Sequence, residues 1–173
     1  TEIGDGPWSV RWPRASVPEE VAPLNEIESI TPYTWEILRN GVDCVLLAVG
    51  TMVIPALEAA DVLEGNGLRC TVVNCRFLKP FDHLVLEEVV KSHPIVLTLE
   101  EGQLVNGFGS FIAREINALG LETLPRISAI GLPDEFIDHG SREAILAELG
   151  LDVGGIVSRV RELTVSKAEL EAV

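Results

Sequence analysis

Short apolar runs and segments of helical periodicity alternate along most of the chain. Four of the runs are apolar at successive positions, which is typical of strands that are buried on both faces of a sheet. These runs cover residues 43–49 (DCVLLAV), 69–75 (RCTVVNC), 94–99 (PIVLTL) and 123–130.

The segments between and after these runs carry apolar residues at helical spacing. Capping residues open several of them, with Thr51, Asp82, Ser141 and Asp152 as plausible N-caps. We therefore expect helices over residues 52–65, 82–91, 108–119, 141–149 and from 152 through 163 or beyond, with loops over 100–107 and 131–140.

A further short strand is expected over residues 33–38, ahead of the first buried run. Asn40 and Gly41 follow it, and this dipeptide is a hairpin turn signal. The first strand should then be antiparallel and lie at an edge. Together the elements predict an α/β fold of three layers, with a mostly parallel five-stranded sheet and one antiparallel edge strand.

Residues 1–31 lack any such periodicity. Pro7, Pro13, Pro18 and Pro23 interrupt them, and acidic residues are frequent. We interpret residues 1–31 as an arm or linker and residues 32–173 as the folded domain.

Composition narrows the class of partner. The 173 residues carry 13 Lys and Arg against 27 Asp and Glu, a net charge of −14, so nucleic acid and anionic membrane surfaces are not expected partners. The chain shows neither a transmembrane run nor a signal peptide at Thr1, and its three cysteines lie within apolar runs. Free, buried thiols and a cytoplasmic location are the expectation.

Candidate chemistry gathers in loops at the carboxyl ends of the expected strands, where open α/β sheets bind ligands. Glu100 and Glu101 end one strand, and Gly107 and Gly109 make the following loop permissive for close packing. Paired carboxylates can perform acid–base work because crowding raises one pKa. They can equally cap the next helix or bind a neighbouring Arg.

The histidines and the basic residues of the arm are the other candidates. His139 lies in a Gly-rich loop at a strand end, whereas His83 and His93 are expected at the surface, and no histidine pair has metal-ligand spacing. Arg11 and Arg14 could bind a phosphate or carboxylate, or could simply neutralise some of the acidic residues.

Five stretches carry a family resemblance: VRWPR (10–14), VNCRFLKPFD (73–82), TLEEGQLVNGFGS (98–110), IGLPDEFIDHGS (130–141) and LGLDVGGI (149–156). With them the chain resembles the C-terminal domain of the transketolase-type thiamine diphosphate enzymes. The last two stretches and VRWPR are most similar to the 1-deoxy-D-xylulose-5-phosphate synthase family.

The resemblance implies a parent enzyme that condenses pyruvate with glyceraldehyde 3-phosphate and releases CO₂, at the start of a non-mevalonate isoprenoid pathway. Such an enzyme is a homodimer located in the bacterial cytosol or a plastid. Its two preceding domains hold thiamine diphosphate and Mg²⁺, and this chain has neither the metal motif nor a catalytic residue. We therefore expect the chain alone to bind no cofactor and to be inactive.

The resemblance also assigns roles to individual residues. Arg14 matches the family's arginine that binds the phosphate of glyceraldehyde 3-phosphate, although Trp12 and Ala15 depart from the family's Tyr and Gly. Arg11 and His139 could support it. Glu100, Glu101, Gly107 and Gly109 would form a structural loop against the preceding domains or the partner subunit.

Two other interpretations remain open at this point. One is the C-terminal domain of another thiamine diphosphate enzyme, either a transketolase or the β subunit of a 2-oxoacid dehydrogenase E1. The other is a non-catalytic interaction or anion-binding module.

Overall fold

The computed structural model describes residues 7, 9 and 30–170, with side chains described as far as Thr164. The chain divides into two units, residues 1–30 and 31–173, and only the second is described as a fold. Arg11, Arg14 and most of the expected arm lie outside the described residues.

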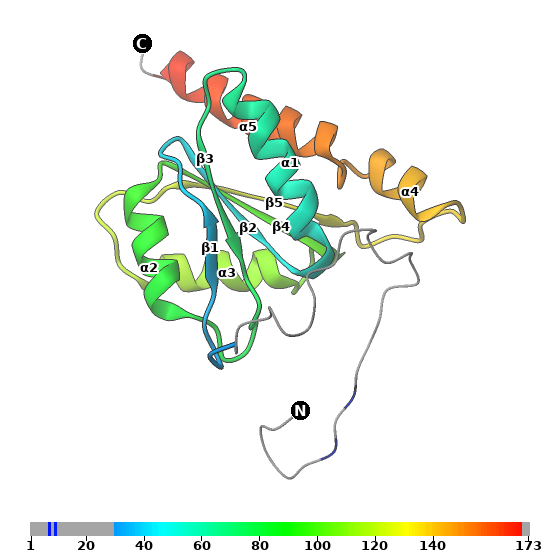
Figure 1. Ribbon diagram of the computed structural model, residues 1–173, viewed down its shortest axis with the longest axis horizontal. Coiled ribbons are helices and arrows are strands. Elements are labelled where there is room, and N and C mark those ends of the chain that lie inside the picture. Colours follow the sequence, from blue (N-terminus) through cyan, green and yellow to red (C-terminus); the bar gives the residue numbers. More distant parts are fainter. Residues whose placement is uncertain (1–6, 8, 10–29, 171–173) are drawn as a thin grey trace. The chain divides into compact units, whose positions relative to one another are not determined.

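The second unit alternates strands and helices as the sequence predicts (Figure 1). The elements are β1 (Glu36–Arg39), β2 (Cys44–Ala48), a 3₁₀ turn η2 (Gly50–Met52), α1 (Val53–Glu64), β3 (Cys70–Asn74), α2 (His83–Ser92), β4 (Ile95–Gln103), α3 (Phe108–Ala118), β5 (Arg126–Leu132), α4 (Arg142–Glu148) and α5 (Val153–Leu170).

The five strands form one sheet in the order β1-β3-β2-β4-β5. All neighbours are parallel except β1, which runs antiparallel to β3 at the edge. The expected α/β fold with one antiparallel edge strand is confirmed.

The expected hairpin at Asn40-Gly41 is wrong, because β1 pairs with β3 and not with β2. The connection crosses the start of β3, where the backbone N–H groups of Val42 and Asp43 both donate to the carbonyl of Arg69 at 3.0 Å. A Cβ on Gly41 would lie 2.4 Å from that carbonyl oxygen, so the crossing requires a glycine. The Asn-Gly dipeptide therefore serves close passage over a neighbouring strand.

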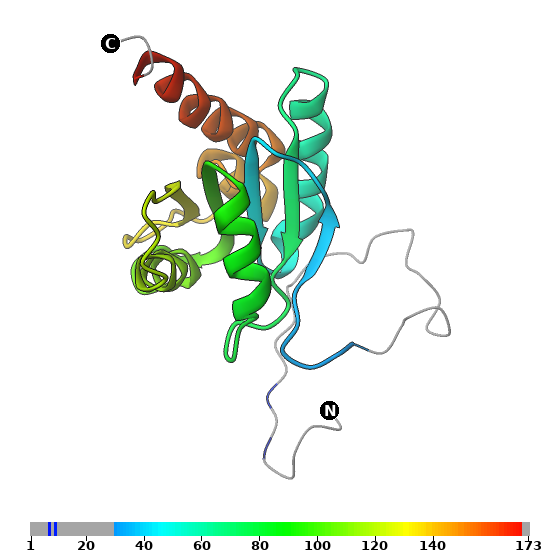
Figure 2. The ribbon, with the colours of Figure 1, turned by 90° about the vertical axis from the view of Figure 1, so that its left-hand side faces the viewer.

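Helices cover both faces of the sheet, which gives three layers (Figure 2). Side chains of β2 alternate between two cores, as the two-residue period of a strand requires. Cys44, Leu46 and Ala48 face the core under α1 and α5, and Val45 and Leu47 face the core under α2 and α3.

Three of the expected helix caps are confirmed. The side chains of Asp82 and Ser141 accept hydrogen bonds from the backbone N–H groups of Val85 and Ala144, and Asp152 accepts one from Gly155. Thr51 is not a cap, because it lies in η2 and its hydroxyl donates to Glu101 instead.

The histidines divide between surface and interior. His83 is exposed, as expected, but the expectation that His93 lies at the surface is wrong, since only 7% of the residue is exposed. Its Nδ1 lies 2.7 Å from the Val89 carbonyl oxygen and its Nε2 lies 2.8 Å from the Thr71 hydroxyl. Through these contacts His93 joins the end of α2 to β3.

The three cysteines are free and buried, as the apolar runs predict. Burial raises the pKa of the Cys75 thiol, so this sulfur stays protonated and unreactive. Among the helices that the structure describes, none is long and apolar enough to cross a membrane.

Candidate functional site

The candidate residues meet at the carboxyl ends of β4 and β5. Residues 100–103 were expected in a loop, but β4 continues through them to Gln103. The extension forms because Gln103 pairs with Leu132 of β5 beyond a bulge, and the N–H of Leu104 then donates to the Leu132 carbonyl at 2.9 Å. Extending β4 places Glu100 and Glu101 on a strand, so their side chains leave on opposite faces of the sheet.

Glu100 points toward α3 and is 6% exposed. Its two carboxylate oxygens accept hydrogen bonds from the backbone N–H groups of Phe108 and Gly109, with N···O distances of 2.8 Å each. These amides open α3 and have no acceptor within the helix, so the carboxylate satisfies them and lies at the positive end of the helix dipole. Both oxygens of Glu100 are thus committed to the fold.

The glycines of this loop make room for that carboxylate. A Cβ on Gly107 would lie 1.9 Å from the Gln103 carbonyl oxygen and 2.7 Å from Glu100 Oε2. A Cβ on Gly109 would lie 2.7 Å from the Thr98 hydroxyl oxygen. The strand, its turn and the helix start can therefore approach this closely only with glycine at both positions.

Glu101 points to the opposite face and forms an ion pair with Arg142 at the start of α4. Arg142 Nε donates to Glu101 Oε1 at 2.9 Å, and the Thr51 hydroxyl donates to Glu101 Oε2 at 2.7 Å. The hydrogen bond from Arg142, assisted by that from Thr51, holds the pKa of Glu101 below its ordinary value. The two carboxylates point to opposite faces of the sheet, so they do not form a crowded pair.

His139 lies beside this ion pair, in the loop between β5 and α4. It lines a cavity of about 410 Å³ together with Glu101, Arg142, Leu132 and Ile145. The imidazole is exposed, and the structure shows no hydrogen bond from it to the other described side chains. The fold therefore brings together three of the expected residues, Glu100, Glu101 and His139, at one end of the sheet.

Arg142 and Thr51 were missed by the sequence interpretation. A signal for Arg142 existed, because a cation in the first turn of a helix is unfavourable unless a carboxylate compensates it. No comparable signal marked Thr51, since a Thr at a strand-to-helix turn is as typical of an N-cap.

The chemistry available at this end of the sheet is limited by these bonds. Glu100 is occupied by backbone amides and Glu101 by a guanidinium, so neither is a free base. Within residues 30–164, no three His, Cys, Asp or Glu side chains gather as metal ligands. The polar groups at this end of the sheet hold the strand ends and loops in place.

Comparisons with known proteins show which family this domain resembles. The family model "Transketolase, C-terminal domain" matches residues 33–156. Two relatives named 1-deoxy-D-xylulose-5-phosphate synthase, from Bacillus velezensis and Geobacillus thermodenitrificans, are each 40% identical over 92% of this chain. The chain spans about a quarter (25%) of the length of these relatives.

Solved structures agree on the architecture. A split-gene transketolase, described as an inactive β4 tetramer, superposes with a TM-score of 0.76 at 31% identity, covering 88% of this chain and 48% of that one. A Pichia stipitis transketolase complex with sedoheptulose 7-phosphate superposes at 0.59 with 21% identity, over 79% of this chain and 18% of its own, a likeness of fold alone. With the family model matching most of its residues, the chain belongs to the transketolase C-terminal domain family.

Proposed function

We propose that this chain is the C-terminal domain of a thiamine diphosphate-dependent synthase. The parent enzyme condenses pyruvate with glyceraldehyde 3-phosphate, forming 1-deoxy-D-xylulose 5-phosphate and CO₂. The observation that carries the proposal is the 40% identity over 92% of the chain to relatives that bear that name. The resemblance in the GLPDEFIDHGS and LGLD stretches supports the same choice.

In this proposal the chain contributes structure to the parent enzyme. Thiamine diphosphate supplies the carbanion chemistry when it is bound by the preceding domains. Glu100 holds the start of α3, and Glu101 with Arg142 holds α4 against the end of β4. The proposed assembly is a homodimer in the cytosol, where the three thiols remain reduced.

A domain exchange tests the proposal. The matching quarter of the Bacillus velezensis relative is replaced by this chain, and glyceraldehyde 3-phosphate-dependent CO₂ release from pyruvate is measured. We expect the chimera to form 1-deoxy-D-xylulose 5-phosphate, whereas the relative lacking that quarter should not. A chimera that folds and dimerises like the unmodified relative but releases no CO₂ would contradict the proposal.

A second domain exchange distinguishes the proposed synthase from other thiamine diphosphate enzymes. The 31% identity to the split-gene transketolase keeps ketol transfer as the second candidate. If transketolase were correct, the chain should instead support transfer from xylulose 5-phosphate when it replaces the matching part of the Pichia stipitis transketolase, with the unmodified transketolase assayed alongside. Activity in that exchange alone would favour the second candidate.

The chain alone should not bind the cofactor. Calorimetric titration of the 173-residue chain with thiamine diphosphate and Mg²⁺ is expected to show no heat of binding at micromolar concentrations. Saturable binding in that range would place cofactor ligands within this chain and overturn the assignment of its role.

Arg14 is the proposed phosphate-binding residue of this chain. A guanidinium binds a phosphate through two parallel hydrogen bonds, which a neutral side chain cannot replace. Arg14→Ala in the active chimera should raise the KM for glyceraldehyde 3-phosphate at least about tenfold, with little change for pyruvate. Arg159→Ala, at a surface arginine that pairs with Glu162, is the matched control. Equal effects of Arg14→Ala on both substrates would refute the role of Arg14.

A further inference from the structure

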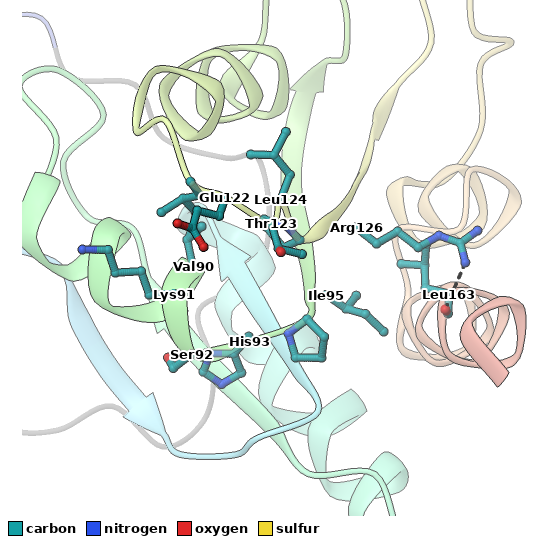
Figure 3. A pocket seen from close by; sticks show the side chains of 13 residues that line it. Val90, Lys91, Ser92, His93, Ile95, Glu122, Thr123, Leu124, Arg126 and Leu163 are labelled. Carbon is teal, nitrogen blue, oxygen red and sulfur yellow. Dashed lines mark hydrogen bonds between the residues drawn. The ribbon is translucent and has the colours of Figure 1, made fainter. Parts of the chain in front are cut away.

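A second cavity lies at the amino ends of β4 and β5, at the opposite end of the sheet from the Glu101–Arg142 pair. Its volume is about 660 Å³, which is within the range of small-molecule sites. The end of α2, the start of β4, the connection between α3 and β5, and α5 surround it (Figure 3). Its apolar lining consists of Val90, Pro94, Ile95, Leu121, Leu124, Pro125 and Leu163.

Apolar side chains at this end of the sheet remain in contact with water. The N–H of Arg126 donates to the Pro94 carbonyl at 2.8 Å, so β4 and β5 are joined from their first residues. Leu124, in the segment that connects α3 to β5, is 48% exposed. Apolar surface that stays in contact with water is favourable to cover with an apolar ligand.

The polar groups on the α2 side are already occupied. The Lys91 ammonium forms an ion pair with Glu87 and points away from the cavity, while Glu122 lies on the same side (Figure 3). The His93 ring is held by Val89 and Thr71, and the Ser92 hydroxyl donates to the Glu88 carbonyl at 2.8 Å. Because Lys91 is paired with Glu87, the charge left on this side is that of Glu122, which does not attract an anion.

Arg126, on the α5 side, differs from these groups. Its Nη1 donates to the Leu163 carbonyl at 3.2 Å, which anchors the guanidinium at the rim. No carboxylate among the described side chains forms an ion pair with it, and the same holds for Arg69 and Arg161, whereas Arg39, Arg76, Arg114, Arg142 and Arg159 have such partners. The remaining N–H donors of Arg126 therefore favour an anionic group at this side of the cavity.

We propose that this cavity binds a small apolar molecule with a single anionic head group, its apolar body between α2 and α5 and its head on Arg126. The apolar floor is formed by residues of four different elements, so the ligand would also join the end of α2 to α5. This proposal does not rest on the reaction proposed for the parent enzyme.

The test uses the full chain and three probes with one apolar body: octanoate, octanol and octylammonium. Each probe is titrated while backbone amide shifts are followed by NMR. Octanoate should shift the backbone amide signals of residues 91–93, 95, 121–124 and 126 saturably. Octanol should bind about fivefold more weakly because it lacks the charge. Octylammonium binding as tightly as octanoate would overturn the proposal without any variant.

Two variants with matched controls localise the site. Arg126→Gln should lower octanoate affinity to that of octanol, whereas Arg159→Gln, on a paired arginine of α5, should leave it unchanged. Thr123→Trp should fill the cavity and abolish the binding of octanoate and octanol. Leu84→Trp, at a position 80% exposed on α2, should leave the binding of both unchanged. Octanoate binding that is the same in Arg126→Gln and the unmodified chain would refute the role of Arg126, and thermal melts establish that each variant is folded.

Discussion

Glu100 and Glu101 are neighbours in the sequence, but their carboxylates have different surroundings. One is buried against two backbone amides, and the other is partly exposed beside a guanidinium. The sequence left helix capping and arginine binding as alternatives for the pair. Both occur, one for each residue, because consecutive side chains of a strand face opposite sides.

Removing the Glu100 carboxylate should lower the free energy of unfolding strongly. Glu100→Ala leaves the amides of Phe108 and Gly109 buried without an acceptor, so the free energy of unfolding should fall by about 3 kcal/mol. Urea denaturation measures the change. Glu88→Ala, at an exposed position of α2, is the control and should change the value by less than about 0.5 kcal/mol.

Glu101 should make stability depend on pH. Its pKa is lower in the folded chain than in the unfolded chain, so its contribution is present above the ordinary glutamate value of about 4.3 and is lost as the pH falls through the folded value. Glu101→Gln should therefore destabilise the chain by up to about 1 kcal/mol at pH 7. The difference between the two proteins should vanish in acid, and a difference that is constant from pH 7 to pH 3 would exclude the ion pair as its cause.

At the scale of elements, two features depend on contacts between residues distant in the sequence: the pairing of β1 and the extension of β4. The apolar runs and caps predicted most strands and helices, since burial on both faces and capping leave local signals. The partner of β1 left none, because pairing with β3 rather than β2 depends on where Gly41 crosses the Arg69 carbonyl. The extension of β4 likewise depends on Leu132, a residue distant in the sequence.

The turn from β4 to α3 should be the least tolerant of a methyl group. Gly107→Ala would bring a Cβ within 1.9 Å of the Gln103 carbonyl oxygen, and the backbone must shift away from Glu100. We expect a loss of more than about 2 kcal/mol in the free energy of unfolding. In Gly65→Ala the Cβ meets nothing closer than 3.5 Å, and stability should be unchanged or raised by up to about 1 kcal/mol. Equal effects of the two changes in denaturation experiments would contradict the close packing at Gly107.

For the whole molecule, both hydrophobic cores are built from residues at or beyond Trp35. The division between an arm over residues 1–31 and a domain over 32–173 remains a prediction. Its site residues Arg14 and Arg11 lie outside the described residues, so their proposed role depends on the family resemblance, whereas Glu100 and Glu101 can be judged from their contacts.

Deleting residues 1–30 tests that division. The shortened chain should unfold in a single transition, with a free energy of unfolding within about 0.5 kcal/mol of that of the full chain. Circular dichroism with a urea gradient measures both proteins. A shortened chain that loses its cooperative transition would show that the domain begins earlier.

The position of β3 between β1 and β2 also bears on how the chain is made. Synthesis proceeds from the amino end, so β1 leaves the ribosome first, but its partner Asn74 follows Glu36 by about forty residues. At roughly 5–20 residues per second, β1 waits about two to eight seconds for a strand to pair with. The strand that is translated first therefore has no partner until β3 emerges, and a nascent chain stalled before residue 70 would expose it to chaperones and proteases.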